Sequence, residues 1–201
     1  MATPPFKAGE RTNLAQADVL LADSSPEGLE VLIQMFAGFG VHMPHCAVTA
    51  EEAMTKMGER ELHLIVADVS LPDQDGYDLV RWLRRSGPAI NRTTAVILLS
   101  GHTRSSDVAK ARDCGANFVI RKPVVPLVML QRVVWVSRES RDFIEAAGYC
   151  GPDRRVRALG PPMGTKVRRK DDLSLDVGAA TTPNLDQDDI DAMFQPKRAT
   201  Q

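Results

Sequence analysis

Four residues with chemically useful side chains each close a short apolar run of this chain. Asp23 follows VLLA, Asp68 follows LIVA, Ser100 ends AVILLS, and Lys122 stands between FVIR and a proline. A single aspartate after a buried strand is often only a turn or N-cap residue. Two carboxylates, a hydroxyl and a cation brought into one small volume would suit metal-assisted phosphoryl transfer, in which a carboxylate attacks phosphorus and holds it as an acyl phosphate.

The elements that must position these residues are five apolar runs that alternate with amphipathic stretches. Continuous apolar strands separated by helices favour a parallel sheet covered on both faces, so the fold class expected is α/β, a doubly wound five-stranded parallel sheet. The carboxyl ends of its strands would gather the four residues at one edge. The last helix is expected to begin after Pro126 and to reach Phe143. The expected strands span residues 18–23, 41–48, 62–68, 94–100 and 117–120.

Composition limits the classes of function. The 201 residues are 43% hydrophobic with a net charge of -1, which argues against a general affinity for DNA or membranes. No apolar run approaches the roughly 18 residues of a membrane span, and the first residues lack the apolar stretch of a signal peptide, so a cytoplasmic location is expected. Three cysteines without CxxC spacing indicate structural thiols.

The chain is expected to divide into one folded domain and a long tail. A disordered segment 1–16 precedes a domain at 17–147, and a basic flexible arm at 148–170 precedes an acidic tail at 171–201. The tail is expected to be disordered except for a short amphipathic helix at 185–195. That helix has acids in its first turn and four apolar residues for a partner: Leu185, Ile190, Met193 and Phe194.

The segments around the four strand ends resemble the response-regulator receiver family of two-component signalling. The matching motifs are VLLAD, IVADVSLPDQDGYDL, VILLSG and IRKP, in the family's order, and the likeness covers roughly residues 18–143. It implies a flavodoxin-like receiver fold and a cis peptide between Lys122 and Pro123.

The resemblance also implies a role for each site residue. Asp68 would be the phosphate acceptor, and Mg²⁺ would be held by Asp23, Asp68 and the backbone carbonyl of Ser70. Lys122 would contact the phosphoryl group, and Ser100 stands where a hydroxyl turns toward bound phosphate. A histidine kinase or phosphotransfer protein would be the phosphate source.

Two departures from the family pattern bear on this reading. Active receivers carry paired acids after the first strand, but Ser24 follows Asp23 here, which removes one charge from the metal site. The position three before the lysine is Val119 rather than Tyr or Phe, so the family's aromatic switch is expected to be absent. A pseudo-receiver that is not phosphorylated is therefore the alternative.

The basic arm supplies what such a pseudo-receiver could bind. Arg154, Arg155 and Arg157 weakly resemble arginine-rich segments with which some receiver-like proteins bind cyclic di-GMP, since guanidinium groups can fork onto phosphates and stack on bases. The competing reading is a solvated linker balanced by the acidic tail.

The tail peptide LDQDDIDAMF resembles the receiver-binding peptide at the start of the flagellar motor switch protein. If the likeness holds, the tail would dock on this protein's own receiver domain, on another receiver, or on a flagellar motor component. The chain as a whole is then interpreted as a single-domain response regulator and signalling adaptor in chemotaxis or motility, not as an enzyme.

Overall fold

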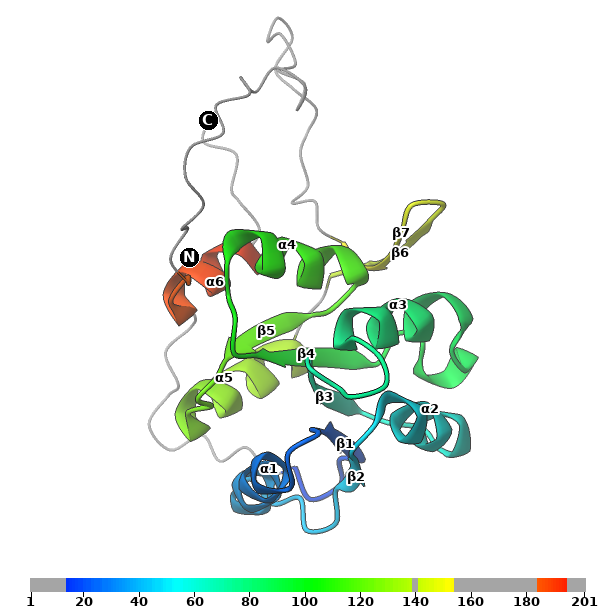
Figure 1. The fold of residues 1–201 in the computed structure, drawn as a ribbon. Helices are drawn as coiled ribbons and strands as arrows, with labels where there is room; N and C mark the ends of the chain where they lie inside the picture. Colours follow the sequence, from blue (N-terminus) through cyan, green and yellow to red (C-terminus); the bar gives the residue numbers. More distant parts are fainter. Residues whose placement is uncertain (1–13, 139–140, 154–183, 195–201) are drawn as a thin grey trace, which may run out of the picture.

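The computed structural model describes residues 14–138, 141–153 and 184–194. Its centre is a five-stranded sheet of order β2-β1-β3-β4-β5 in which every neighbouring pair is parallel. The prediction of a doubly wound parallel sheet is therefore confirmed (Figure 1). The strands are β1 (Val19–Ala22), β2 (His45–Ala47), β3 (Leu64–Asp68), β4 (Ala95–Ser100) and β5 (Phe118–Arg121).

Helices cover both faces of this sheet, with α1 and α5 on one side and α2, α3 and α4 on the other (Figure 1). The strand interiors are consequently buried on both faces, which explains why they read as continuous apolar runs. No helix in the described part of the chain is long and apolar enough to cross a membrane. The helices are α1 (Pro26–Gly38), α2 (Ala50–Glu59), α3 (Gly76–Ser86), η1 (Ala89–Asn91), α4 (Ser105–Cys114), α5 (Pro126–Ser137) and α6 (Gln187–Phe194).

Local side chains begin the first three helices. The side chains of Ser25, Thr49 and Asp75 accept hydrogen bonds from the first free backbone amides of α1, α2 and α3. At Thr49 the arrangement is close to a capping box: its hydroxyl accepts from the Glu52 amide at 3.1 Å, and the Glu52 carboxylate accepts from the amide of Val48, one residue before the cap.

One part of the expected fold was wrong. The helix predicted to reach Phe143 ends at Ser137, and a hairpin of β6 (Phe143–Ala146) and β7 (Tyr149–Pro152) follows it. β7 is buried against α3 and α4, so the first residues assigned to a basic arm from Gly148 belong to the folded body. The helical pattern misled because the apolar residues of α5 continue at irregular spacing into Phe143 and Ile144, which pair as a strand instead.

Candidate functional site

Asp23, Asp68 and Lys122 meet at the carboxyl edge of the sheet. Asp23 follows β1, Asp68 ends β3, and Lys122 follows β5. The Lys122 Nζ donates to Asp23 Oδ2 at 2.7 Å and also to Asp68 Oδ2. The two aspartates are only 1% and 7% exposed, so their charges depend on this lysine and on backbone amides.

Backbone groups hold both carboxylates in place. The Ser25 amide donates to Asp23 Oδ1 at 2.9 Å, and the Ser70 amide donates to Asp68 Oδ1 at 2.9 Å. A Cβ on Gly28 would lie 2.8 Å from the Asp23 carboxylate, so only glycine lets α1 begin this close to it. One oxygen of each carboxylate is thereby fixed by a backbone amide while the other faces Lys122.

Lys122 remains a cation at neutral pH. Burial acts to lower the pKa of Lys122, but its hydrogen bonds to Asp23 and Asp68 outweigh burial and raise that pKa above the ordinary value of 10.5. The Lys122–Pro123 peptide is cis, as expected from the sequence.

Ser100 lies at the end of β4 with its hydroxyl turned into its own loop. Its Oγ donates to the His102 carbonyl at 2.5 Å and accepts from the His102 amide at 3.2 Å. The hydroxyl would have to leave these partners in order to reach a phosphoryl group at Asp68. The His102 side chain itself is exposed.

The oxygen atoms at this edge suit a hard divalent cation. The Ser24 hydroxyl donates to the Ser70 carbonyl at 3.1 Å, which brings that carbonyl beside the Asp23 segment. Carboxylates and a backbone carbonyl are donors that Mg²⁺ accepts, with water completing its shell. Within the described ranges no group of three or more His, Cys, Asp or Glu side chains could hold a metal, so a bound Mg²⁺ would rest on two carboxylates, a carbonyl and water.

The aromatic residue of β5 serves a different contact. Val119 is buried, and Phe118 packs edge-on against Trp135 at 4.7 Å between ring centroids. Phe118 also stacks on Phe194 of α6, with 5.3 Å between the ring centroids. The aromatic ring adjacent to Val119 in β5 therefore packs against the tail helix.

The tail helix lies on the receiver's own surface, beside β5 and α4 (Figure 1). Ile190 and Phe194 are fully buried there, and Leu185 and Met193 pack partly buried against the same core. Asp186 caps the helix through a 2.9 Å bond from the Asp189 amide. A helix of eight residues is observed where one at 185–195 was expected, and its apolar residues share one side as predicted.

Four residues of this contact were missed by the sequence reasoning. Gln187 accepts from the Arg121 amide at 2.9 Å and donates to the Val119 carbonyl at 3.0 Å. Asp191 forms an ion pair with Arg132 of α5, and both side chains are buried. The sequence signal for this ion pair was Arg132 itself, a single charged residue among the apolar residues of α5.

The fourth residue is Thr103, in the loop after β4. Its hydroxyl donates to the Leu185 carbonyl at 2.8 Å, and its carbonyl accepts from the Leu185 amide at 2.8 Å. The arginines expected to bind a nucleotide, at positions 154, 155 and 157, lie outside the described residues.

A five-stranded parallel sheet with two aspartates and a cis-proline lysine at its carboxyl edge defines a receiver-type signalling domain. Residues 19–134 match the family model described as "Response regulator receiver domain", and this chain belongs to that family.

Known relatives place the same domain in different proteins. The chain is 34% identical over 121 residues to an uncharacterized 14.6 kDa protein of Leptolyngbya boryana, covering 60% of this chain and 89% of that one. It is 29% identical over 164 residues to a protein-glutamate methylesterase/protein-glutamine glutaminase of Myxococcus xanthus, covering 81% of this chain. The match spans only 45% of the methylesterase's own length.

A solved structure agrees with the fold. The signal receiver domain of a signal transduction histidine kinase from Syntrophus aciditrophicus matches with a TM-score of 0.54 and 28% identity, covering 65% of this chain and 98% of that one. The common part is the receiver domain.

Proposed function

We propose that this chain is a single-domain response regulator in which phosphorylation of Asp68 controls protein–protein contacts. The observation that carries the proposal is the convergence of Asp23, Asp68 and Lys122 at one edge of the sheet. Receiver domains interact with histidine kinases or phosphotransfer proteins, and such a protein is the proposed phosphate source.

The chemistry proposed for this edge is a single displacement at phosphorus. The Asp68 oxygen that faces Lys122 attacks the phosphodonor, the bond between phosphorus and the donor breaks, and an acyl phosphate remains on Asp68. Receiver domains typically bind Mg²⁺ at this position, and here Asp23, Asp68 and the Ser70 carbonyl would hold it. Lys122 would then exchange its carboxylate partner for a phosphoryl oxygen.

Chemotaxis or flagellar motility is the proposed setting. The tail peptide LDQDDIDAMF resembles the receiver-binding peptide of the flagellar motor switch protein, and one relative of this chain is named a protein-glutamate methylesterase/protein-glutamine glutaminase. The proposed output is a contact made by the receiver surface and the tail, with a receiver or motor component as partner.

Phosphate incorporation from acetyl phosphate and Mg²⁺ tests this function. The intact mass of the native chain is expected to rise by one phosphoryl group, and that of Asp68→Asn is expected not to change. Asp78→Asn, which alters an exposed carboxylate in α3, is the matched control and should incorporate as the native chain does. A native chain that takes no phosphate even at high Mg²⁺ would contradict the proposal and favour the pseudo-receiver with a nucleotide-binding arm.

A further inference from the structure

Within the described residues, α6 binds the edge of β5, and the phosphate chemistry does not require this contact. α6 begins 66 residues after Arg121 in sequence, yet its first residue is bonded to that strand. β5 is the last strand of the sheet, so the amide of Arg121 and the carbonyl of Val119 point away from β4 with no neighbouring strand to pair them. Gln187 satisfies both with one side-chain amide, as an added strand would.

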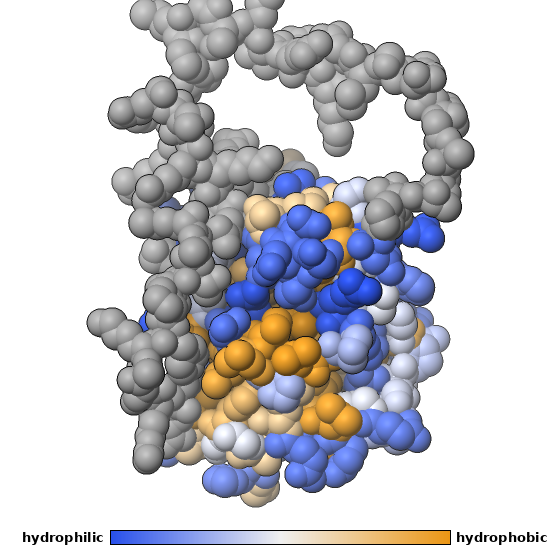
Figure 2. Space-filling model, turned by 90° about the vertical axis from the view of Figure 1, so that its left-hand side faces the viewer, coloured by the Kyte–Doolittle hydropathy of each residue, from blue (hydrophilic) through white to orange (hydrophobic). Residues whose placement is uncertain are grey.

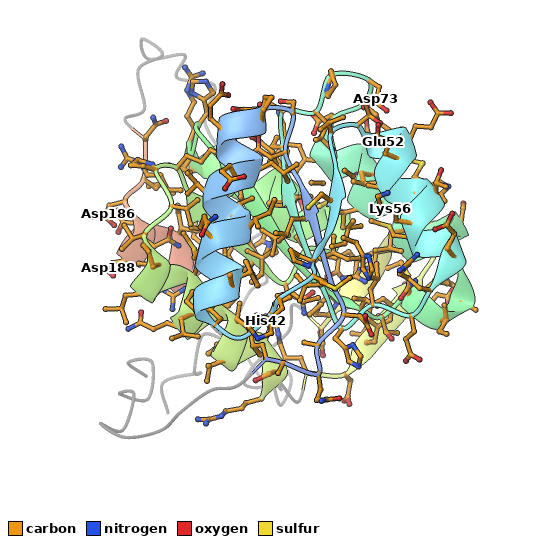
Figure 3. All side chains as sticks on the ribbon, turned by 90° about the horizontal axis from the view of Figure 1, so that it is seen from below. His42, Glu52, Lys56, Asp73, Asp186 and Asp188 are labelled. Atoms are coloured by element: carbon orange, nitrogen blue, oxygen red, sulfur yellow. The ribbon has the colours of Figure 1, made fainter. Side chains whose placement is uncertain are left out.

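Beyond the hydrogen bonds of Gln187, the following turns of α6 contact the receiver surface through apolar side chains. Ile190 and Phe194 stand three and seven residues after Gln187, so all three lie on one face of the helix. Phe194 stacks on Phe118, which places the last turn of α6 beside the first residue of β5. The opposite face keeps Asp188 and Asp189 in solvent, and Figure 3 shows Asp186 and Asp188 at the outside of the molecule.

A buried ion pair makes the contact selective. Asp191 is paired with Arg132, whose guanidinium also lies over the Phe118 ring at 5.2 Å. Gln187 donates to Asp191 at 2.9 Å, so the edge-strand anchor and the ion pair form one network. Because the loss of hydration offsets much of the attraction between the two buried charges, the pair adds little to the strength of docking. It instead disfavours helices that lack an acid at the position of Asp191.

The contact is also suited to release. A helix of eight residues is shorter than the roughly 12 to 15 needed for stability in water, so α6 is helical only while docked.

The surface around α6 is partly apolar. Figure 2 looks onto the side of the molecule where α6 and α5 lie and shows hydrophilic surface beside a hydrophobic area. Exposed Val125 and Leu127 at the start of α5 continue the apolar surface beyond the helix.

We propose that α6 is a built-in occupant of the surface formed by α4, β5 and α5, and that it excludes partner helices of its own chemistry. The excluded ligand is an acidic amphipathic helix with Gln, Ile, Asp and Phe at positions i, i+3, i+4 and i+7. Covalent attachment presents α6 to this surface at an effective concentration commonly on the order of millimolar, so a free helix must compete against it. The proposal does not depend on phosphorylation of Asp68.

Binding of a labelled peptide of residues 184–194 to full-length chains tests the exclusion. The variant Ile190→Ser/Phe194→Ala removes the apolar contacts of the resident helix and leaves every residue of the receiver surface unchanged. The peptide is expected to bind this variant about tenfold or more tightly than the native chain, as for a surface that is open at most a tenth of the time. Asp189→Asn changes an exposed residue of α6 and should bind the peptide as weakly as the native chain does.

Two further measurements identify the surface. A peptide carrying Asp191→Asn should lose at least tenfold in affinity for the released variant, and this comparison leaves the protein's own fold unaltered. Hydrogen exchange at the Arg121 amide should be slow in the native chain and faster in Gln187→Ala. Equal peptide affinity for the native and released chains, or no binding to either, would overturn the proposal.

Discussion

At the scale of single residues, Lys122 is the group on which the site depends most. It is the cation that both buried carboxylates share, and it would meet the negative charge that develops on a transferring phosphoryl group. Lys122→Gln is therefore expected to slow phosphate incorporation from acetyl phosphate on the order of 100-fold, by analogy with the loss of one transition-state donor.

The control for that prediction is Lys110→Gln, which changes an exposed lysine of α4. Its incorporation rate should match that of the native chain. A Lys122→Gln chain that reacts at the native rate would show that the lysine only neutralises the site in the resting state.

The cysteines give a second prediction at this scale. Burial raises the pKa of the Cys114 thiol to about 12, and burial also raises the pKa of the half-buried Cys46. Since the thiolate is the reactive form, Cys114 should resist iodoacetamide at pH 8 and Cys46 should be alkylated before it. Peptide mass spectrometry gives the order, and all three cysteines should react once the chain is unfolded in denaturant.

At the scale of elements, Asp73 ties the loop after β3 to the start of α2. Its carboxylate accepts from the Ala50 amide at 2.8 Å and from the Glu51 amide at 2.9 Å. Figure 3 shows Asp73 beside Glu52 at that end of the helix. These bonds, the Ala50 amide first, lower the pKa of Asp73 below its ordinary value of 3.8.

The sign of the pH effect follows from that direction. A carboxylate with a lowered folded-state pKa contributes stability above its unfolded pKa and loses it as the pH falls through the folded pKa. Asp73→Ala should therefore melt at a lower temperature than the native chain at pH 7, and the difference should shrink below about pH 3.8. A melting difference that stays constant with pH would mean that the ionised carboxylate is not the source.

Arg84 of α3 holds the opposite end of the sheet together. Its buried guanidinium donates to the backbone carbonyls of Arg92, Thr94 and Gly115 and to the Asn117 side chain. Burial lowers the pKa of Arg84 to about 10, which still leaves it protonated at neutral pH.

Loss of this guanidinium should be costly. Arg84→Met leaves buried oxygens without donors, and we expect the free energy of unfolding to fall by about 3 kcal/mol. Urea denaturation measures the loss, with exposed Arg85→Met as a control that should remain within about 0.5 kcal/mol of the native chain. A small loss for Arg84→Met would indicate that the surrounding carbonyls find other partners.

At the scale of the whole molecule, α6 and the residues just before it contact both loops that carry site residues. Thr103, three residues after Ser100, donates a hydrogen bond to the carbonyl of Leu185. Gln187 and Lys122 line the same pocket of about 300 Å³. If the Ser100 hydroxyl turns to a phosphoryl group, it leaves His102 and shifts the loop that anchors the tail. Phosphoryl binding is thus expected to loosen α6.

Thermodynamic reciprocity makes this coupling measurable. Beryllofluoride, a noncovalent mimic of the phosphoryl group, should bind Ile190→Ser/Phe194→Ala about fivefold or more tightly than the native chain, within the usual range of coupling. Correspondingly, it should speed hydrogen exchange at the Arg121 amide of the native chain. Tighter binding to the native chain would reverse the sign, and equal binding would show that the two sites are independent.

Much of this protein was determined by local features of the sequence. Asp23, Asp68 and Lys122 stand at or just after strand ends because the apolar runs stop there. Thr49 and Asp186 cap helices by accepting hydrogen bonds from backbone amides three residues further on. Short-range periodicity and capping act between near neighbours, so they can be recognised without the fold.

Only the tertiary structure decided the contacts that join distant segments. The edge position of β5 leaves an amide and a carbonyl for Gln187, and the arginine of α5 finds Asp191 across the fold. The β6–β7 hairpin likewise depends on burial against α3 and α4 rather than on its own short sequence. These features rest on strand order and packing, because a polar group's partner is set by which surface the finished fold leaves open.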